Sequence, residues 1–191
     1  MDKKYLLMVV LFVLVVFTPN CSRASQSRLM LPLKEDILVR VEGTVLHYQK
    51  KSFWNEDAFL KILKKRDEIE LSQIKRFKDD LFKYGEGGEY ATSFDVKFDK
   101  VERSITLRCD VTGAVSKTGN NYRATFMWLL RPLGLDFIDN DFSESKDELF
   151  WGGLVDNVST TVKIMLPPKD SVYSAWHHPN GHCHAHVWWT E

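Results

Sequence analysis

Apolar and polar residues alternate with a period of two in several stretches of the chain, which is the pattern of half-buried strands. The first such stretch, ILVRVEGTVLHY, runs from Ile37 to Tyr48 and places Ile37, Val39 and Val41 on one face. This stretch predicts a strand. Gly43, which lies inside it, predicts a bulge.

One long stretch, from Asn55 to Tyr84, instead has the period of a helix. At about 100° per residue, its apolar residues fall on one broad face. They are Phe59, Ile62, Leu63, Ile69, Ile74, Phe77, Leu81 and Tyr84. Asn55 is placed as the N-cap and Gly85 as the C-cap, and a kink is expected near Arg66.

After Gly85 the period of two returns. YATSFDVKFDK and RSITLRCDVTGAV alternate and are joined by a short link, which predicts a hairpin, and KTGNN predicts a second turn. Residues 126–130 are apolar on both faces and predict a buried central strand. ELFWGGL and VSTTVKIMLP predict two more strands, and SVYSAWHH with HCHAHVWW predicts a final hairpin.

The order of these elements predicts an α+β fold. We expect one long amphipathic helix packed on a curved, mainly antiparallel sheet of about seven strands. Residues 37–191 form the single domain in this prediction, and residues 25–36 form a tether before it.

The first 24 residues have the pattern of an export signal. Lys3 and Lys4 precede an apolar stretch at 5–17, and Ser22-Arg23-Ala24 is a cleavage signature. Thirteen helical residues reach only ~20 Å, short of the ~30 Å bilayer core, which favours a cleaved signal peptide over an N-terminal membrane anchor. Lipidation of Cys21 is disfavoured, because the residues before it are not those of a lipobox. Either way, we expect a secreted or extracytoplasmic domain, whether or not residues 5–17 anchor it.

Charge excludes one class of partner. The chain has 26 basic and 26 acidic residues. Without Lys3, Lys4 and Arg23 there remain 23 basic residues, and without Asp2 there remain 25 acidic ones. No basic stripe is present, so we expect no nucleic-acid partner.

Five of the six histidines lie near the C-terminus: His177, His178, His182, His184 and His186. Pro179-Asn180-Gly181 predicts a three-residue hairpin loop that places His178 opposite His182 and Trp176 opposite His184. A two-residue loop would instead place His177 opposite His184, and we consider that register less favourable. Cys183, Ala185, Val187 and Trp189 then form the core face of the last strand.

This spacing predicts a transition-metal site. Histidines at i, i+2 and i+4 of one strand span ~13 Å, too far for one ion, so the predicted ligands are His178, His182 and His184. His186 and His177 are less favoured ligands. Imidazole suits zinc or copper. The alternatives are a plain edge strand and a histidine-lined site for protons or a ligand.

Cys109 and Cys183 both fall on predicted core faces, so the sequence leaves open a disulfide between them or two separately buried thiols.

The leading functional hypothesis is therefore an exported or membrane-tethered domain that binds zinc or copper through its C-terminal hairpin. A first alternative is a non-catalytic binding module for an apolar ligand or a protein partner. A second is a metal-dependent hydrolase, for which the sequence names no catalytic residue, so enzymatic activity stays open.

Overall fold

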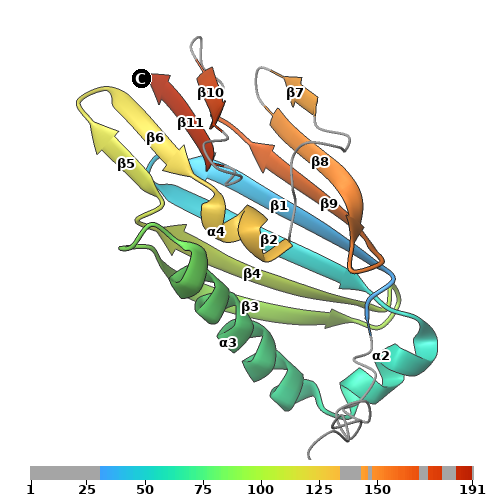
Figure 1. Ribbon diagram of the computed structural model, residues 1–191. Coiled ribbons are helices and arrows are strands. Elements are labelled where there is room, and N and C mark those ends of the chain that lie inside the picture. The colour runs from blue at the N-terminus through green and yellow to red at the C-terminus, as the bar shows by residue number, and fades with distance from the viewer. Residues whose placement is uncertain (1–30, 134–142, 146–147, 168–171, 178–183, 191) are drawn as a thin grey trace, which may run out of the picture. The chain divides into compact units, whose positions relative to one another are not determined.

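The seven-stranded sheet organises the fold of this protein in the computed structural model. The structure describes residues 31–133, 143–145, 148–167, 172–177 and 184–190. The strand order is β3-β4-β2-β1-β9-β8-β7, and a second sheet of four strands has the order β10-β11-β6-β5. Figure 1 shows both sheets with the helices between and beside them.

The large sheet is antiparallel except at one pair. Its strands are β1 (Lys34–Glu42), β2 (Val45–Phe53), β3 (Tyr90–Asp99), β4 (Ser104–Thr112), β7 (Ser143–Ser145), β8 (Glu148–Val155) and β9 (Val158–Met165). β1 pairs with β9 in parallel, so a strand from the start of the domain lies beside one more than a hundred residues later. The expected hairpin β3–β4 is present. The two strands predicted at ELFWGGL and VSTTVKIMLP are β8 and β9, and they pair with each other antiparallel.

The small sheet contains the C-terminal hairpin. Its strands are β5 (Val115–Thr118), β6 (Asn121–Thr125), β10 (Val172–His177) and β11 (His184–Thr190). KTGNN forms the predicted turn, since Thr118 pairs with Asn121 across Gly119 and Asn120. Two sheets are therefore present where the sequence predicted one.

The prediction of one strand from Ile37 to Tyr48 is wrong. Glu42 pairs with Val45, so Gly43 and Thr44 form the two-residue loop of a hairpin. Gly43 has φ +58°, the positive value that such hairpin turns require at their first loop residue. Gly43 therefore reverses the chain, where we had expected a bulge.

The prediction of one continuous helix is wrong, because the chain forms α2 (Glu56–Leu63) and α3 (Arg66–Tyr84). The break between them lies directly before Arg66, where a kink was expected. Residues 64–68 are all exposed, so no core contact holds the helix straight there. Asn55 does cap α2, and its Oδ1 accepts a hydrogen bond from the Ala58 N–H at 2.8 Å. Gly85 ends α3 in extended backbone, with its N–H donating to the Leu81 carbonyl at 2.9 Å.

The apolar run at 126–130 is buried as predicted, but it is helical. It forms α4 (Met127–Leu130), followed by the 3₁₀ turn η2 (Arg131–Leu133). A short run that is apolar at every position carries no period, so its burial is readable from sequence and its conformation is not.

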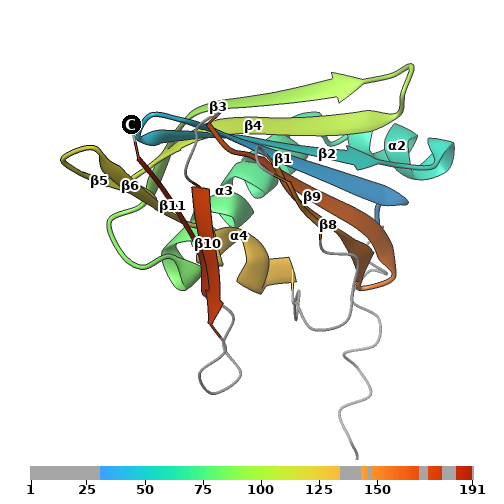
Figure 2. The same cartoon turned by 90° about the horizontal axis from the view of Figure 1, so that it is seen from above.

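Helices α3 and α4 lie on the same side of the seven-stranded sheet (Figure 2). Buried residues of that inner face, of both helices and of the small sheet form one hydrophobic cluster that includes Val39, Leu46, Phe77, Trp128 and Val187. The α+β prediction is confirmed at this level. None of the helices in the described ranges is long and apolar enough to cross a membrane.

Candidate functional site

A small cavity lies between the inner face of the sheet and the two helices above it. Its volume is about 60 Å³. It is lined by Ile37, Tyr48, Lys50, Gln73, Arg76, Phe77, Asp80, Leu107, Trp128, Leu129, Pro132 and Leu133. We call this space the α3 cavity.

Three aromatic rings from three elements form the apolar wall of the α3 cavity. Tyr48 of β2 lies 4.6 Å from Phe77 of α3, measured between ring centroids. Trp128 of α4 lies 5.9 Å from Tyr48 and 5.7 Å from Phe77, both edge-on. These are the separations at which aromatic pairs attract each other, so the wall is a fixed surface.

The indole of Trp128 has an unused hydrogen-bond donor. Its side chain is 3% exposed, and its Nε1 has no acceptor among the residues that the structure describes. A buried N–H without a partner costs about 1–3 kcal/mol, so most buried donors are paired. Trp128 also lines the α3 cavity, so this donor is a candidate contact for a ligand there.

A charged pair interrupts the apolar inner face beside the cavity. Ile37, Lys50 and Leu107 lie side by side on β1, β2 and β4. Lys50 Nζ lies 2.8 Å from Glu35 Oε1, and both side chains are less than one-fifth exposed. Ser52 Oγ also donates to Glu35 Oε1, at 2.9 Å. Charges on a core face are rare unless paired, and here the pairing leaves the ammonium of Lys50 at the cavity.

Helix α3 supplies the opposite rim. Gln73, Arg76 and Asp80 line the cavity at helical spacing, and Arg76 Nε lies 4.0 Å from Asp80 Oδ2. Burial raises the pKa of Asp80, against the opposing effects of the Arg76 and Lys50 charges. Burial also raises the pKa of Tyr48 well above its ordinary value, with Cys109 and Glu35 adding to the effect. The hydroxyl of Tyr48 therefore stays neutral.

No relative identifies this arrangement. Comparisons with protein-family models, with curated proteins and with solved structures found no match to the chain.

The C-terminal hairpin adopts the register that we considered less favourable. His177 pairs with His184, and Trp176 pairs with Ala185, so the predicted pairing of Trp176 with His184 is wrong. His186 pairs with Ala175 on one side and with Thr125 of β6 on the other. Because β6 covers the other edge of β11, this strand is interior to the small sheet, unlike the plain edge strand of the alternative hypothesis.

The metal prediction itself falls largely outside the described residues. His178 and His182 lie in the range 178–183, which the structure does not describe. Within the described ranges, no group of three or more His, Cys, Asp or Glu side chains is placed to hold a metal ion. Of the predicted core face of β11, Val187 and Trp189 are buried as expected, while the side chains of Cys183 and Ala185 lie outside the described residues.

Cys109 is a free, buried thiol in β4. Burial, with a contribution from Asp110, raises its pKa to about 12. A thiol of this pKa is almost entirely protonated at neutral pH, so Cys109 is a poor nucleophile. Cys183 lies outside the described residues, so the disulfide stays a prediction.

The outer face of the large sheet carries one histidine that the sequence analysis did not single out. Arg40, His47 and Asp110 lie side by side on β1, β2 and β4. His47 Nδ1 lies 2.8 Å from Asp110 Oδ1, and His47 Nε2 lies 3.4 Å from Glu42 Oε2. Each imidazole nitrogen thus faces a carboxylate, and His47 of β2 links β1, through Glu42, to β4, through Asp110.

Sequence reasoning missed the residues of the α3 cavity, although one signal was present. Lys50 and Ser52 continue the alternation of Leu46 and Tyr48, which places a lysine on an apolar face. The strand predicted from the sequence ends at Tyr48, so Lys50 lies beyond it. Nothing in the local sequence indicates that Trp128 would meet Tyr48.

Proposed function

We propose that this domain is a binding module for a small molecule with an apolar body and at least one hydrogen-bond acceptor, held in the α3 cavity. This is the metal-free alternative that the sequence left open. The observation that carries it concerns Trp128, which lines the cavity and whose buried Nε1 donor has no acceptor among the described residues.

The lining groups match such a ligand. The rings of Tyr48, Phe77 and Trp128 offer an apolar surface, and sites of this kind hold few but well-placed polar groups. Lys50 and Arg76 add donors at the rim, so an acceptor such as a carboxylate or a carbonyl oxygen suits the site better than a further donor.

The size of the cavity limits the ligand. A single water molecule needs about 10–15 Å³ of cavity volume, so the α3 cavity, with about 60 Å³, holds only a few waters. A cavity of about 150 Å³ holds a whole benzene ring, so an aromatic ligand would enter the smaller α3 cavity with one end only.

The probes for a binding experiment are benzoate, benzyl alcohol and toluene, observed by protein NMR. We expect saturable binding of benzoate and benzyl alcohol to shift signals of α3 and α4. Trp128→Phe keeps an aromatic ring but removes the donor, and should weaken benzoate binding by about tenfold while leaving toluene unchanged. Trp54→Phe is the matched control, because Trp54 Nε1 is also buried without a partner but lies outside the cavity. Absence of saturable binding of all three probes would contradict the proposal.

A second candidate is the zinc or copper site of the C-terminal hairpin. The pairing of His177 with His184 places two imidazole-bearing residues directly opposite each other, and His186 follows two residues later. This observation favours His177 and His184 as a ligand pair, to which His178, His182 or His186 would add.

Metal analysis of untagged protein tests this candidate. We expect stoichiometric zinc or copper, lost in His177→Ala and in His184→Ala but retained in His47→Ala, whose side chain is bonded elsewhere. A metal-free wild-type protein that does not take up either ion would remove this candidate. It would also remove the metal-dependent hydrolase, which needs the same ion with an open coordination position.

A further inference from the structure

One end of the seven-stranded sheet brings together four segments that are far apart in the sequence. Lys34 at the start of β1 pairs with Phe53 of β2 and with Ser159 of β9. Phe53 in turn pairs with Ser104 of β4. The first described residues, α2, the β3–β4 turn and the β8–β9 turn therefore lie at the same end, as Figures 1 and 2 show. We call it the α2 end.

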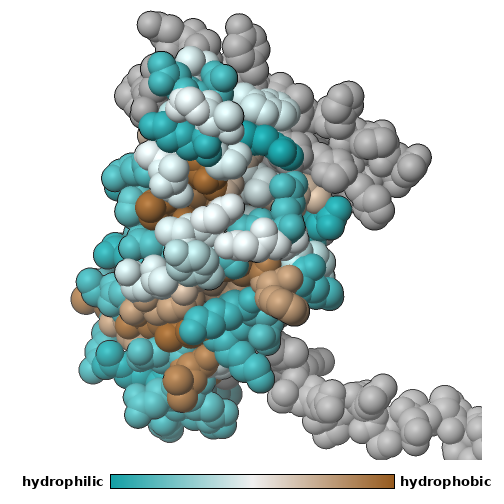
Figure 3. Space-filling model, turned by 90° about the vertical axis from the view of Figure 1, so that its left-hand side faces the viewer, coloured by the Kyte–Doolittle hydropathy of each residue, from teal (hydrophilic) through white to brown (hydrophobic). Residues whose placement is uncertain are grey.

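Exposed apolar side chains gather at the α2 end. Leu31, Leu33, Leu60, Val101 and Leu154 are each more than half exposed, and Val101 reaches 91%. The other large hydrophobic side chains that are exposed in the described ranges, Leu71, Phe82 and Tyr90, lie on α3 and at the start of β3. Figure 3 shows the opposite side of the molecule, the left-hand side of Figure 1, where hydrophobic patches lie among hydrophilic residues, mainly in the lower half. Single exposed apolar residues are common on protein surfaces, whereas a cluster of them indicates a surface that binds another protein or a membrane.

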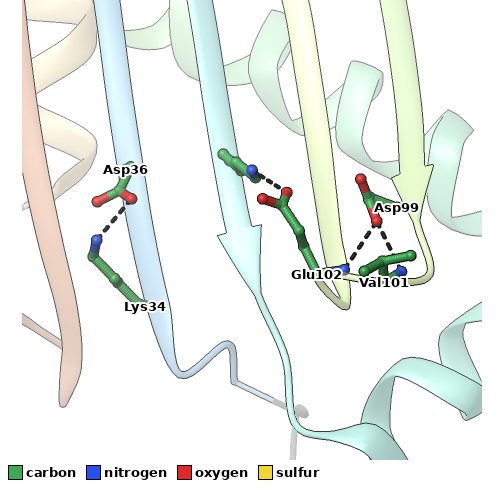
Figure 4. A network of polar contacts seen from close by, with 6 residues as sticks. Lys34, Asp36, Asp99, Val101 and Glu102 are labelled. Atoms are coloured by element: carbon green, nitrogen blue, oxygen red, sulfur yellow. Dashed lines mark hydrogen bonds and ion pairs between the residues drawn. The ribbon is translucent and has the colours of Figure 1, made fainter.

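The β3–β4 turn presents its valine in a fixed conformation. Asp99 Oδ1 accepts hydrogen bonds from the backbone N–H of Val101, at 2.8 Å, and of Glu102, at 2.9 Å (Figure 4). Between Val101 and Leu60 lies a groove of about 290 Å³, which Phe59 and Leu63 also line. Because the turn is already ordered, docking this surface costs little conformational entropy.

The chain before Leu31 argues for a lipid bilayer as the partner. Residues 5–17 are apolar, and residues 18–30 connect them to the α2 end. Thirteen extended residues span at most ~45 Å, so an anchor at 5–17 would hold this end near the bilayer at high effective concentration.

Part of the positive charge at the α2 end is neutralised within the protein. Three cations at the α2 end are already paired: Lys34 with Asp36, Lys51 with Glu102, and Arg103 with Glu56. We therefore expect apolar insertion to be the main driving force, with Lys61, the one lysine of α2, extending its ammonium group towards the lipid headgroups.

We propose that the α2 end docks on the surface of a lipid bilayer, with Leu60, Val101 and Leu154 in the interfacial layer. The proposal is independent of a ligand in the α3 cavity, and it rests on residues 5–17 remaining as an anchor, which the sequence offers as the alternative to cleavage.

A depth measurement on the full chain in phosphatidylcholine vesicles tests the docking. A bimane label is placed by Val101→Cys, or by Phe82→Cys as the control, in a chain carrying Cys21→Ser and Cys183→Ser. Phe82 is the control site because it is 93% exposed and lies in α3, away from this end. We expect lipids with nitroxide headgroups to quench the label at position 101 and to leave the label at position 82 bright. Equal quenching, no quenching at position 101, or failure of the full chain to sediment with vesicles would overturn the proposal.

A variant experiment separates apolar insertion from electrostatic attraction. With the label at position 101, Leu60→Ser with Leu154→Ser should reduce the docked fraction by about tenfold. Phe82→Ser with Tyr90→Ser should leave it unchanged, since both residues are exposed and lie away from the α2 end. Docking should also persist at high salt and without anionic lipid, since screening weakens only charge attraction. Docking that requires anionic lipid and disappears at high salt would contradict insertion of these side chains.

Discussion

The rings of Tyr48 and Phe77 lie 4.6 Å apart, and this contact joins β2 to α3 at the wall of the α3 cavity. Tyr48 is 5% exposed and Phe77 is 8% exposed, so both belong to the core as well as to the candidate site. Stability and the proposed ligand binding would therefore depend on the same residues, and experiments must separate the two.

Phe77→Ala should lower the free energy of unfolding by about 3–5 kcal/mol, because it removes a buried ring and leaves a cavity. Phe82→Ala on the same helix is the control, since Phe82 is 93% exposed, and it should change stability by less than about 0.5 kcal/mol. Urea denaturation followed by circular dichroism measures both. Similar losses for the two variants would show that α3 does not pack through Phe77.

The Lys50–Glu35 pair should behave as a buried ion pair. Lys50→Met or Glu35→Leu alone should destabilise the fold by about 3 kcal/mol, because each leaves one charge without its partner. The double variant should be more stable than either single variant, since two apolar groups then face each other. A double-mutant cycle in urea measures the coupling, and additive effects would contradict it. Lys34 with Asp36, an exposed pair at 2.8 Å, is the control and should couple by less than about 1 kcal/mol.

Asp80 should make stability depend on pH. Its pKa is raised above the ordinary 3.8 in the folded state, so the folded protein binds more protons than the unfolded chain just above that pH. The contribution of Asp80 to the free energy of unfolding therefore falls as the pH rises through this window. Asp80→Asn removes the titration and should gain stability relative to the wild type between about pH 3 and about pH 7. Urea titrations across this range measure the difference, and a flat or falling difference would contradict the prediction.

Gly113 and Gly119 should respond differently to alanine. Both have positive φ, +82° and +61°. A Cβ at Gly113 would lie 2.3 Å from the Gly88 carbonyl oxygen, whereas nothing lies within 4 Å of one at Gly119. Gly119→Ala should cost only the backbone strain, about 1–2 kcal/mol, and Gly113→Ala should cost clearly more. Thermal unfolding compares the two, and equal losses would mean that the approach to Gly88 relaxes freely.

Much of the local structure could be predicted from the sequence, because it depends on neighbours in the chain. The turn at Gly119 and Asn120, the cap at Asn55 and the core face with Val187 and Trp189 follow from side-chain alternation and from turn and capping residues. The class of the fold, α+β, follows from the order of these segments. The histidine cluster was visible too, but the pairing of His177 with His184 was not, because a one-residue change in loop length shifts every pair.

The tertiary structure alone decided how distant segments meet. The parallel pairing of β1 with β9 brings Lys34 beside Ser159, and it creates the α2 end. The helical form of α4 brings Trp128 against Tyr48 and Phe77, and so forms the wall of the cavity. The period of the apolar residues shows which side chains are buried. Which segment each one packs against, and whether a short apolar run is a strand or a helix, depends on how much apolar surface the whole chain removes from water. These contacts therefore form only when the sheets and helices pack together.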